Sequence, residues 1–235
     1  MKFFRNINGY LSEYLPAQSK RLCYALFLGL FGWILLSALG NALVGGGAPG
    51  WVRSIADRLL TLSGHQAILQ GHVWQFVLPT FTLVPQPGQG PAGVAIGFLL
   101  TTAILLMFSR MLEDQEGSDR MFWILATMVV VPSVVYATLD VLTRFRTPRA
   151  GPESLAIGMV VLAGMRNPRA VVHLFMAVPV PLGFLAAFAA SLTGLLYVAE
   201  MTRIGVPFAT ADFSQTITAC LIAVVWAYKP QYLEW

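Results

Sequence analysis

The chain has 235 residues, of which 57% are hydrophobic and only 11% are charged, and its formal net charge is +4. A soluble domain carries about 25% charged residues, so this composition excludes an ordinary soluble protein and requires lipid around much of the surface. We expect the basic residues to flank membrane helices and to meet lipid headgroups, and we expect no nucleic-acid partner. Cys23 and Cys220 lie within apolar runs without a metal-ligand spacing, so we interpret them as packing residues.

The N-terminal residues 1–21 mix basic and aromatic side chains, a composition typical of an interfacial segment on the cytoplasmic side of a membrane. The first apolar run, residues 22–44, is long enough to cross a bilayer. The next forty residues or so, from Trp51 to Pro91, are rich in Trp and Pro. We expect them to lie in the interface or to enter the bilayer in part.

The apolar runs predict an all-α fold, a polytopic bundle of six membrane helices within one domain of residues 22–228, followed by a tail of residues 229–235. The expected spans are 22–44, 92–109, 121–143, 154–165, 181–199 and 213–228. The fourth run would reach only about 18 Å, whereas the hydrocarbon core is about 30 Å thick. We therefore expect a short central helix that its neighbours shield from lipid, or a re-entrant one.

Two polar segments are expected to be loops between the spans, one at residues 110–120 and one at 200–212. With the N-terminus inside, more Lys and Arg residues fall inside than outside, which favours a cytoplasmic N-terminus and C-terminus. The basic residues at 144–149 argue against this orientation, because they would then lie outside.

The titratable residues offer little chemistry within the membrane. His65, His72 and His173 do not pair with another ligand at helical spacing, so we expect no metal and no cofactor. The centres of the predicted spans hold no ionisable residue, which disfavours an ion-coupled or proton-coupled transporter.

The segment between the second and third spans contains Leu112-Glu113 and Gly117-Ser118. We expect Ser118 or Asp119 to cap the third helix. Glu113 can accept hydrogen bonds from free backbone N–H groups or pair with a neighbouring arginine, Arg110 or Arg120. A charged loop at the level of the headgroups would account for the same pattern.

Ser154 stands at the start of the short fourth run, directly after Glu153. A nucleophilic serine would need an exposed turn, a base and an oxyanion hole. We favour the alternative that Ser154 is an N-cap and that the helix dipole favours Glu153 beside it.

From Val73 to Ala227 these segments resemble the rhomboid family of intramembrane proteins. Four motifs carry the resemblance. Trp74-Gln75 is similar to the family's Trp-Arg, and Leu112-Glu113 with Gly117-Ser118 is similar to its Leu-Glu and Gly-Ser. The segment from Gly151 to Gly158, with Ser154, is similar to its Gly-x-Ser-Gly, and Asn167-Pro168 with Val178 to Pro181 is similar to its entry into the fifth helix. The resemblance implies a six-helix bundle whose short fourth helix begins at a serine.

This chain departs from the family at the residues that would carry catalysis. Ser154 matches the family's nucleophile, but Gln215 or its neighbour stands where the sixth helix should carry a histidine. Gly97 and Thr101 fall near the positions of the family's oxyanion-binding His and Asn, and Leu155 replaces the glycine after the serine.

A serine hydroxyl without a base is a weak nucleophile. The resemblance therefore implies an inactive, rhomboid-like pseudoprotease, comparable in kind to the derlins.

We accordingly expect a non-catalytic protein that binds or scaffolds other transmembrane segments, with membrane lipids and other membrane proteins as partners. The sixth span carries a small residue at every fourth place, Ala219, Ala223 and Ala227, which permits close packing of another helix. We expect this other helix to be mainly the fourth helix of the same bundle. Two alternatives stay open: an active intramembrane serine protease using Ser154, and a structural subunit of a larger membrane complex.

Overall fold

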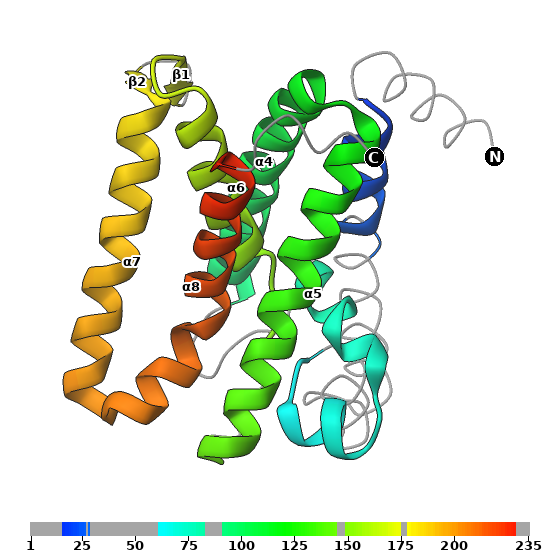
Figure 1. Cartoon of the computed structure of the whole chain (residues 1–235), viewed down its shortest axis with the longest axis vertical. Coiled ribbons are helices and arrows are strands. Elements are labelled where there is room, and N and C mark those ends of the chain that lie inside the picture. The colour runs from blue at the N-terminus through cyan, green and yellow to red at the C-terminus, as the bar shows by residue number, and fades with distance from the viewer. Residues whose placement is uncertain are drawn as a thin grey trace.

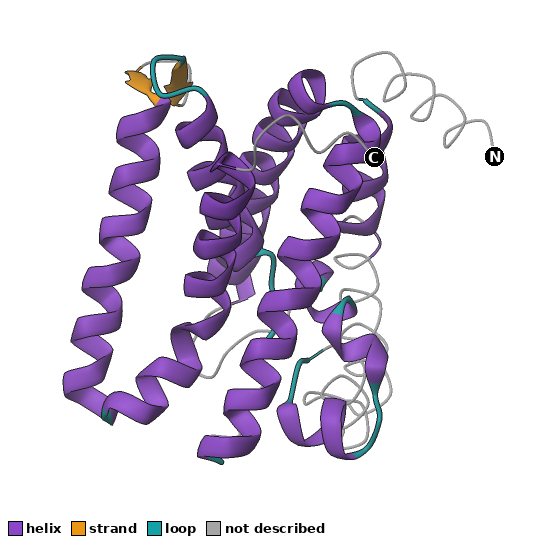
Figure 2. Cartoon of the chain, in the orientation of Figure 1, coloured by secondary structure: helices purple, strands orange, loops and turns teal. Residues whose placement is uncertain are grey.

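A computed structural model describes residues 16–26, 28, 61–82, 91–144, 149–174 and 178–228. These residues form a bundle of helices with a small hairpin at one end (Figures 1 and 2). The long elements are α4 (Pro91–Glu116), α5 (Ser118–Thr143), α6 (Glu153–Arg166), α7 (Leu182–Ile204) and α8 (Val206–Tyr228). The short elements are η1 (His65–Leu69), η2 (Val73–Phe76), η3 (Leu78–Phe81), β1 (Val171–Leu174) and β2 (Val178–Pro181), and residues 17–26 are also helical.

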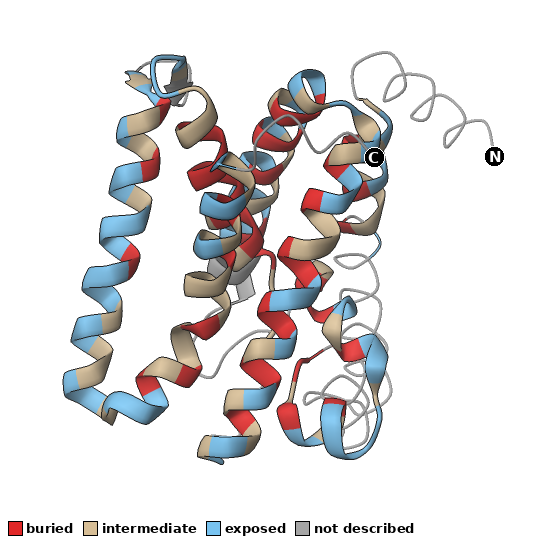
Figure 3. Cartoon of the chain, viewed as in Figure 1, coloured by how far each residue is buried: buried red, intermediate tan, exposed pale blue. Residues whose placement is uncertain are grey.

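Four of the described helices, α4, α5, α7 and α8, are long and apolar enough to cross a bilayer. Large apolar side chains cover their outer faces, including Phe184 (64% exposed), Leu195 (66%) and Val225 (66%). Such surfaces are unfavourable in water but match hydrocarbon. The chain is therefore an integral membrane protein with several spans, and α7 presents most of its length to the surroundings (Figure 3).

Helix α6 lies at the centre of the bundle, in contact with α4, α7 and α8. Nine of its 14 residues are buried, and at 1.5 Å per residue it is about 21 Å long, less than the ~30 Å of the hydrocarbon core. The expected short central helix at residues 154–165 is thus confirmed, with one further residue at each end. Neighbouring helices surround it, so it does not need to cross the bilayer by itself.

Two glycines of α6 allow this close packing. A side chain on Gly164 would come within 2.6 Å of the Leu182 carbonyl oxygen at the start of α7, and one on Gly158 would lie 3.1 Å from the Ala219 side chain on α8. Ala219 and Ala223 are fully buried. Ala219 of the last helix therefore packs against α6 within the bundle, as expected.

The second span was predicted too short. Helix α4 continues to Glu116, so the charged residues 110–116 form its last two turns and not a loop. Gly117 alone interrupts the chain before α5 begins at Ser118, and its φ of 81° is one that glycine adopts without strain. The expected cap is also wrong, because the N-cap residue of α5 is Gly117 and no side chain caps this end.

The predicted polar loop at residues 200–212 is likewise helical. Helix α7 extends to Ile204 and α8 begins at Val206, with Gly205 (φ 88°) as the only break. Glu200 and Arg203 form an ion pair one turn apart on the surface of α7, so their charges are satisfied without ending the helix. The last two helices are therefore longer than the expected spans of 181–199 and 213–228.

A hairpin between α6 and α7 was not predicted. Strands β1 and β2 pair antiparallel, with Val171 opposite Pro181 and Leu174 opposite Val178. The hairpin lies at one end of the bundle, above α7 (Figure 1). It begins directly after the short central helix and returns the chain to α7, which starts at Leu182.

The expected first span, residues 22–44, falls largely outside the described residues, as do the terminal segments 1–15 and 229–235. Residues 17–26 form one continuous helix, which therefore begins before Leu22, and the interfacial placement of residues 1–21 stays a prediction. The cytoplasmic placement of both termini stays a prediction.

Candidate functional site

The N-terminal end of α6 positions Ser154 and Glu153 at the edge of the bundle core. The N-cap residue is Pro152, and no side chain caps this end of the helix, so the expected capping role of Ser154 is wrong. Ser154 lies in the first turn and is partly buried, while Glu153 is exposed. Leu155 and Ala156, which follow, are buried in the core.

Two contacts show that α6 and α8 run side by side in the same direction. Gly158 faces Ala219 near the start of the pair, and Arg166 Nη2 donates a hydrogen bond of 3.0 Å to the Trp226 carbonyl oxygen further along. Residues four apart lie on the same face of a helix. Ser154 and Gln215 each stand one turn before the Gly158–Ala219 contact, on α6 and α8 respectively.

The groups around the Ser154 hydroxyl decide whether this serine could act as a nucleophile. Among the described residues, no hydrogen bond links Ser154 Oγ to another side chain or to Gln215. The nearest carboxylate along α8, Asp212, is engaged in an ion pair with Arg149. A neutral amide such as Gln215 cannot accept a proton from a hydroxyl at ordinary pH.

The Arg149–Asp212 pair was not foreseen from the sequence. Arg149 also exchanges backbone hydrogen bonds with Leu62, at 2.7 and 3.0 Å, and so ties the segment before η1 to the start of α6 and to α8. The only sequence signal was a basic residue in one loop and an acidic residue near another run, and nothing in their spacing indicates that they meet.

A groove opens between α4 and α7, and α6 forms its floor. Its volume is about 400 Å³, and α4 and α7 barely contact each other. Its walls are mostly apolar. The lining residues include Thr101, Ile104, Glu153, Ile157, Leu185 and Ala189.

Of the two positions matched to an oxyanion site, the structure places Thr101 in this groove, whereas a side chain on Gly97 would meet open space. Glu153 also lines the groove, at the same end of α6 as Ser154. Thr101 has a hydroxyl that can donate one hydrogen bond. The groove therefore combines an apolar wall with a few polar groups at one end.

Glu113 belongs to a different place in the molecule. Its carboxylate accepts hydrogen bonds from the backbone N–H groups of Gln18 (2.8 Å) and Ser19 (2.7 Å) and from the hydroxyls of Ser19 (2.7 Å) and Ser118 (2.6 Å). It therefore caps helix 17–26 from the end of α4, and it pairs with neither Arg110 nor Arg120. Arg120 instead pairs with Glu116, which also holds Arg166 of α6 at 3.1 Å.

Trp74 lies on η2, 38% exposed, and stacks on the ring of His72 with centroids 4.6 Å apart. The motif residues thus separate into three places: Trp74 on the η segment, Glu113 and Gly117 at the end of α4, and Ser154 with Gly158 on α6. Within residues 16–26, 61–82, 91–144, 149–174 and 178–228, no three His, Cys, Asp or Glu side chains gather as metal ligands.

Comparison of the chain with protein-family models, curated proteins and solved structures found no match.

Proposed function

We propose that this chain is a non-catalytic, rhomboid-like membrane protein that binds a transmembrane segment of another protein in the groove between α4 and α7. The observation that carries the proposal is the groove itself. It is largely apolar, it has a volume of about 400 Å³, and it lies between two membrane-spanning helices that barely contact each other.

The dimensions of the groove suit part of a helix. Its lining residues on α4 run from Thr101 to Phe108, a distance of about 10 Å or two helical turns. Ala156 on the floor and Ala189 on α7 are small. Small residues allow two helix backbones to approach closely in lipid, where packing rather than the hydrophobic effect drives association.

A non-catalytic role is supported by the groups around Ser154. Proton removal from a serine hydroxyl needs a base within about 3 Å. Gln215, which the resemblance matches to the family's histidine, has no basic nitrogen. The alternative, a serine protease acting through Ser154, would need a base that is hydrogen-bonded to this hydroxyl. Asp212 is paired with Arg149, and no described side chain, the exposed neighbour Glu153 included, hydrogen-bonds to Ser154.

Site-specific photo-crosslinking in native membranes tests the proposal. A benzophenone amino acid replaces Ile157, on the floor of the groove, and in a control variant replaces Leu195, on the outer face of α7 and 66% exposed. We expect a polypeptide adduct at Ile157 and none at Leu195. The cross-linked peptide should map to an apolar stretch of about 20 residues in the partner.

A second substitution makes this test specific. Ala189→Phe fills the groove from α7 and should abolish the adduct at Ile157, whereas Phe188→Ala, on an exposed position of the same helix (55% exposed), should leave it. Adducts that contain lipid alone, or the same polypeptide at Ile157 and Leu195, would contradict the proposal.

A further inference from the structure

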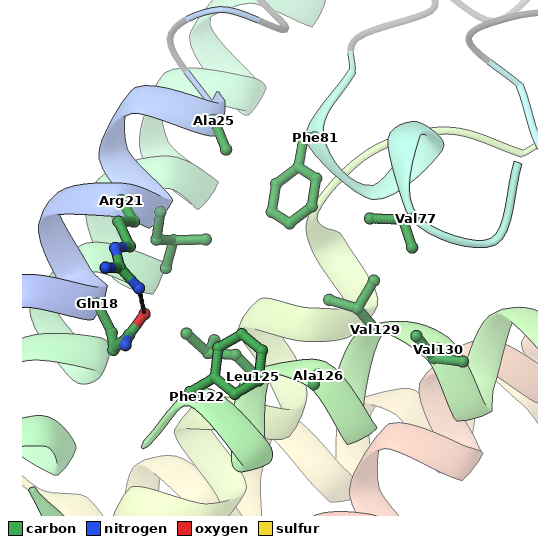
Figure 4. A pocket seen from close by; sticks show the side chains of 11 residues that line it. Gln18, Arg21, Ala25, Val77, Phe81, Phe122, Leu125, Ala126, Val129 and Val130 are labelled. Atoms are coloured by element: carbon green, nitrogen blue, oxygen red, sulfur yellow. Dashed lines mark hydrogen bonds between the residues drawn. The ribbon is translucent and has the colours of Figure 1, made fainter. Parts of the chain in front are cut away.

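A second hollow lies between helix 17–26, the η2–η3 segment and the first half of α5 (Figure 4). Its volume is about 350 Å³, within the range of small-ligand pockets. Ala25 lies on one wall, Phe81 on another, and Ala126 with Val130 on a third. The lining is apolar except at one end, where Gln18 and Arg21 lie together (Figure 4).

The depth of this hollow indicates what can occupy it. Its lining on α5 extends from Phe122 to Val130, which is about 12 Å at 1.5 Å per residue. One leaflet contributes about half of the ~30 Å hydrocarbon core. The hollow is therefore about one leaflet deep, long enough for much of an acyl chain and too short for a helix that crosses the membrane.

The polar end of the hollow carries the positive charge of Arg21, which forms no ion pair with a described carboxylate. Arg21 is exposed, and among the described residues its guanidinium contacts only the neutral Gln18, with Nη1 donating to Oε1 at 3.5 Å. Phe122 and Trp123, 47% and 61% exposed, lie at the start of α5. Exposed aromatic rings at the end of a membrane helix are typical of the headgroup region.

We propose that this hollow binds one acyl chain of an anionic glycerophospholipid, with the lipid phosphate held by Arg21. The apolar walls match the chain, and the arginine matches the phosphate, for which its planar guanidinium is well suited. A lipid already lies in the same leaflet, so binding requires only lateral exchange. This site is separate from the groove between α4 and α7, and the two proposals can fail independently.

Native mass spectrometry of the delipidated, full-length protein in detergent tests the site. Phosphatidylglycerol and phosphatidylcholine with identical acyl chains are added at equal concentrations. We expect one retained lipid per protein and a preference of about fivefold for phosphatidylglycerol, the factor that one basic residue near a headgroup supplies. Arg21→Gln should remove this preference. Arg110→Gln, an exposed arginine of α4 outside the hollow, should leave it unchanged.

A second pair of variants tests the acyl chain. Ala126→Phe fills the hollow from α5 and should lower the retention of both lipids at least tenfold, and Ala25→Phe should do the same from the opposite wall. Val225→Phe, on the outer face of α8, is the matched control.

Three results would overturn the proposal. The first is unchanged lipid retention in both filled variants, and the second is an equal loss of preference in Arg21→Gln and Arg110→Gln. The third is the absence of any lipid adduct with one-to-one stoichiometry, including the case in which a polypeptide is retained in its place.

Discussion

Replacing Glu113 with alanine tests whether one buried carboxylate holds helix 17–26 against the bundle. Glu113 is 3% exposed and accepts four hydrogen bonds, three of them from Gln18 and Ser19 in the first turn of that helix. Loss of an N-cap partner costs about 1 kcal/mol, and a buried donor left unpaired costs about 1–3 kcal/mol. Because Ser19 is fully buried, we expect Glu113→Ala to weaken the docking of this helix by about 2–4 kcal/mol.

The thiol of Cys23 provides a local assay, because it lies partly buried on the same helix. In a Cys220→Ser background, the rate at which a maleimide labels Cys23 in detergent reports the opening of the helix. A loss of about 2 kcal/mol corresponds to labelling about 30-fold faster. Asp114→Ala, an exposed neighbour on α4, is the matched control and should change the rate by less than about threefold.

Two results would refute this reasoning. Equal labelling rates in Glu113→Ala and the parent protein would mean that the carboxylate does not hold the helix. A lower free energy of unfolding with an unchanged Cys23 rate would mean that Glu113 acts through Ser118 at the α4–α5 junction instead.

Three further predictions follow from single positions. Gly158→Leu should lower the free energy of unfolding by about 1–3 kcal/mol, because the new side chain would press on Ala219. The control Gly97→Leu places its side chain in open space and should have little effect. Denaturant titration measures the free energy of unfolding of both variants. Gly205→Ala should cost about 1–3 kcal/mol in the same titration, because at φ 88° and ψ 158° only glycine is unstrained, and an unchanged midpoint would contradict this. A fluorophosphonate probe should not label Ser154; covalent labelling that Ser154→Ala abolishes would establish a nucleophile and overturn the non-catalytic proposal.

The sequence predicted the all-α class and the central helix because both depend on local composition. A run of twelve apolar residues cannot cross the bilayer, so its burial among neighbours follows from length alone. The packing of Ala219 on α6 was also predictable, since small residues at every fourth position form a flat face.

The helix ends were not predictable from charge. Residues 110–116 look like a loop because charged side chains avoid hydrocarbon, yet Glu116 pairs with Arg120 on α5 and with Arg166 on α6. Arg166 is distant in sequence from Glu116, so the composition of the segment does not reveal this partner. The glycines at 117 and 205 mark the true breaks through their positive φ values.

The candidate site was foreseen in part. The structure places Ser154 and Gln215 one turn before the Gly158–Ala219 contact, and the match of these two residues to the rhomboid site stays a prediction. Two cavities were not foreseen, namely the groove between α4 and α7 and the hollow beside Arg21. Each forms where neighbouring helices do not contact each other, and no local pattern in a single sequence indicates which helices these are. The β1–β2 hairpin was missed because prolines at 179 and 181 suggested a simple break before a helix.

The cap on helix 17–26 has a consequence for how the protein is made. Gln18 and Glu113 are separated by 95 residues along the chain, and ribosomes add about 5–20 residues per second. Roughly 5–20 s therefore pass between the synthesis of the helix and the arrival of the carboxylate that completes its first turn. During insertion, headgroups or water must solvate those N–H groups, so helix 17–26 is completed only after α4 has been synthesised.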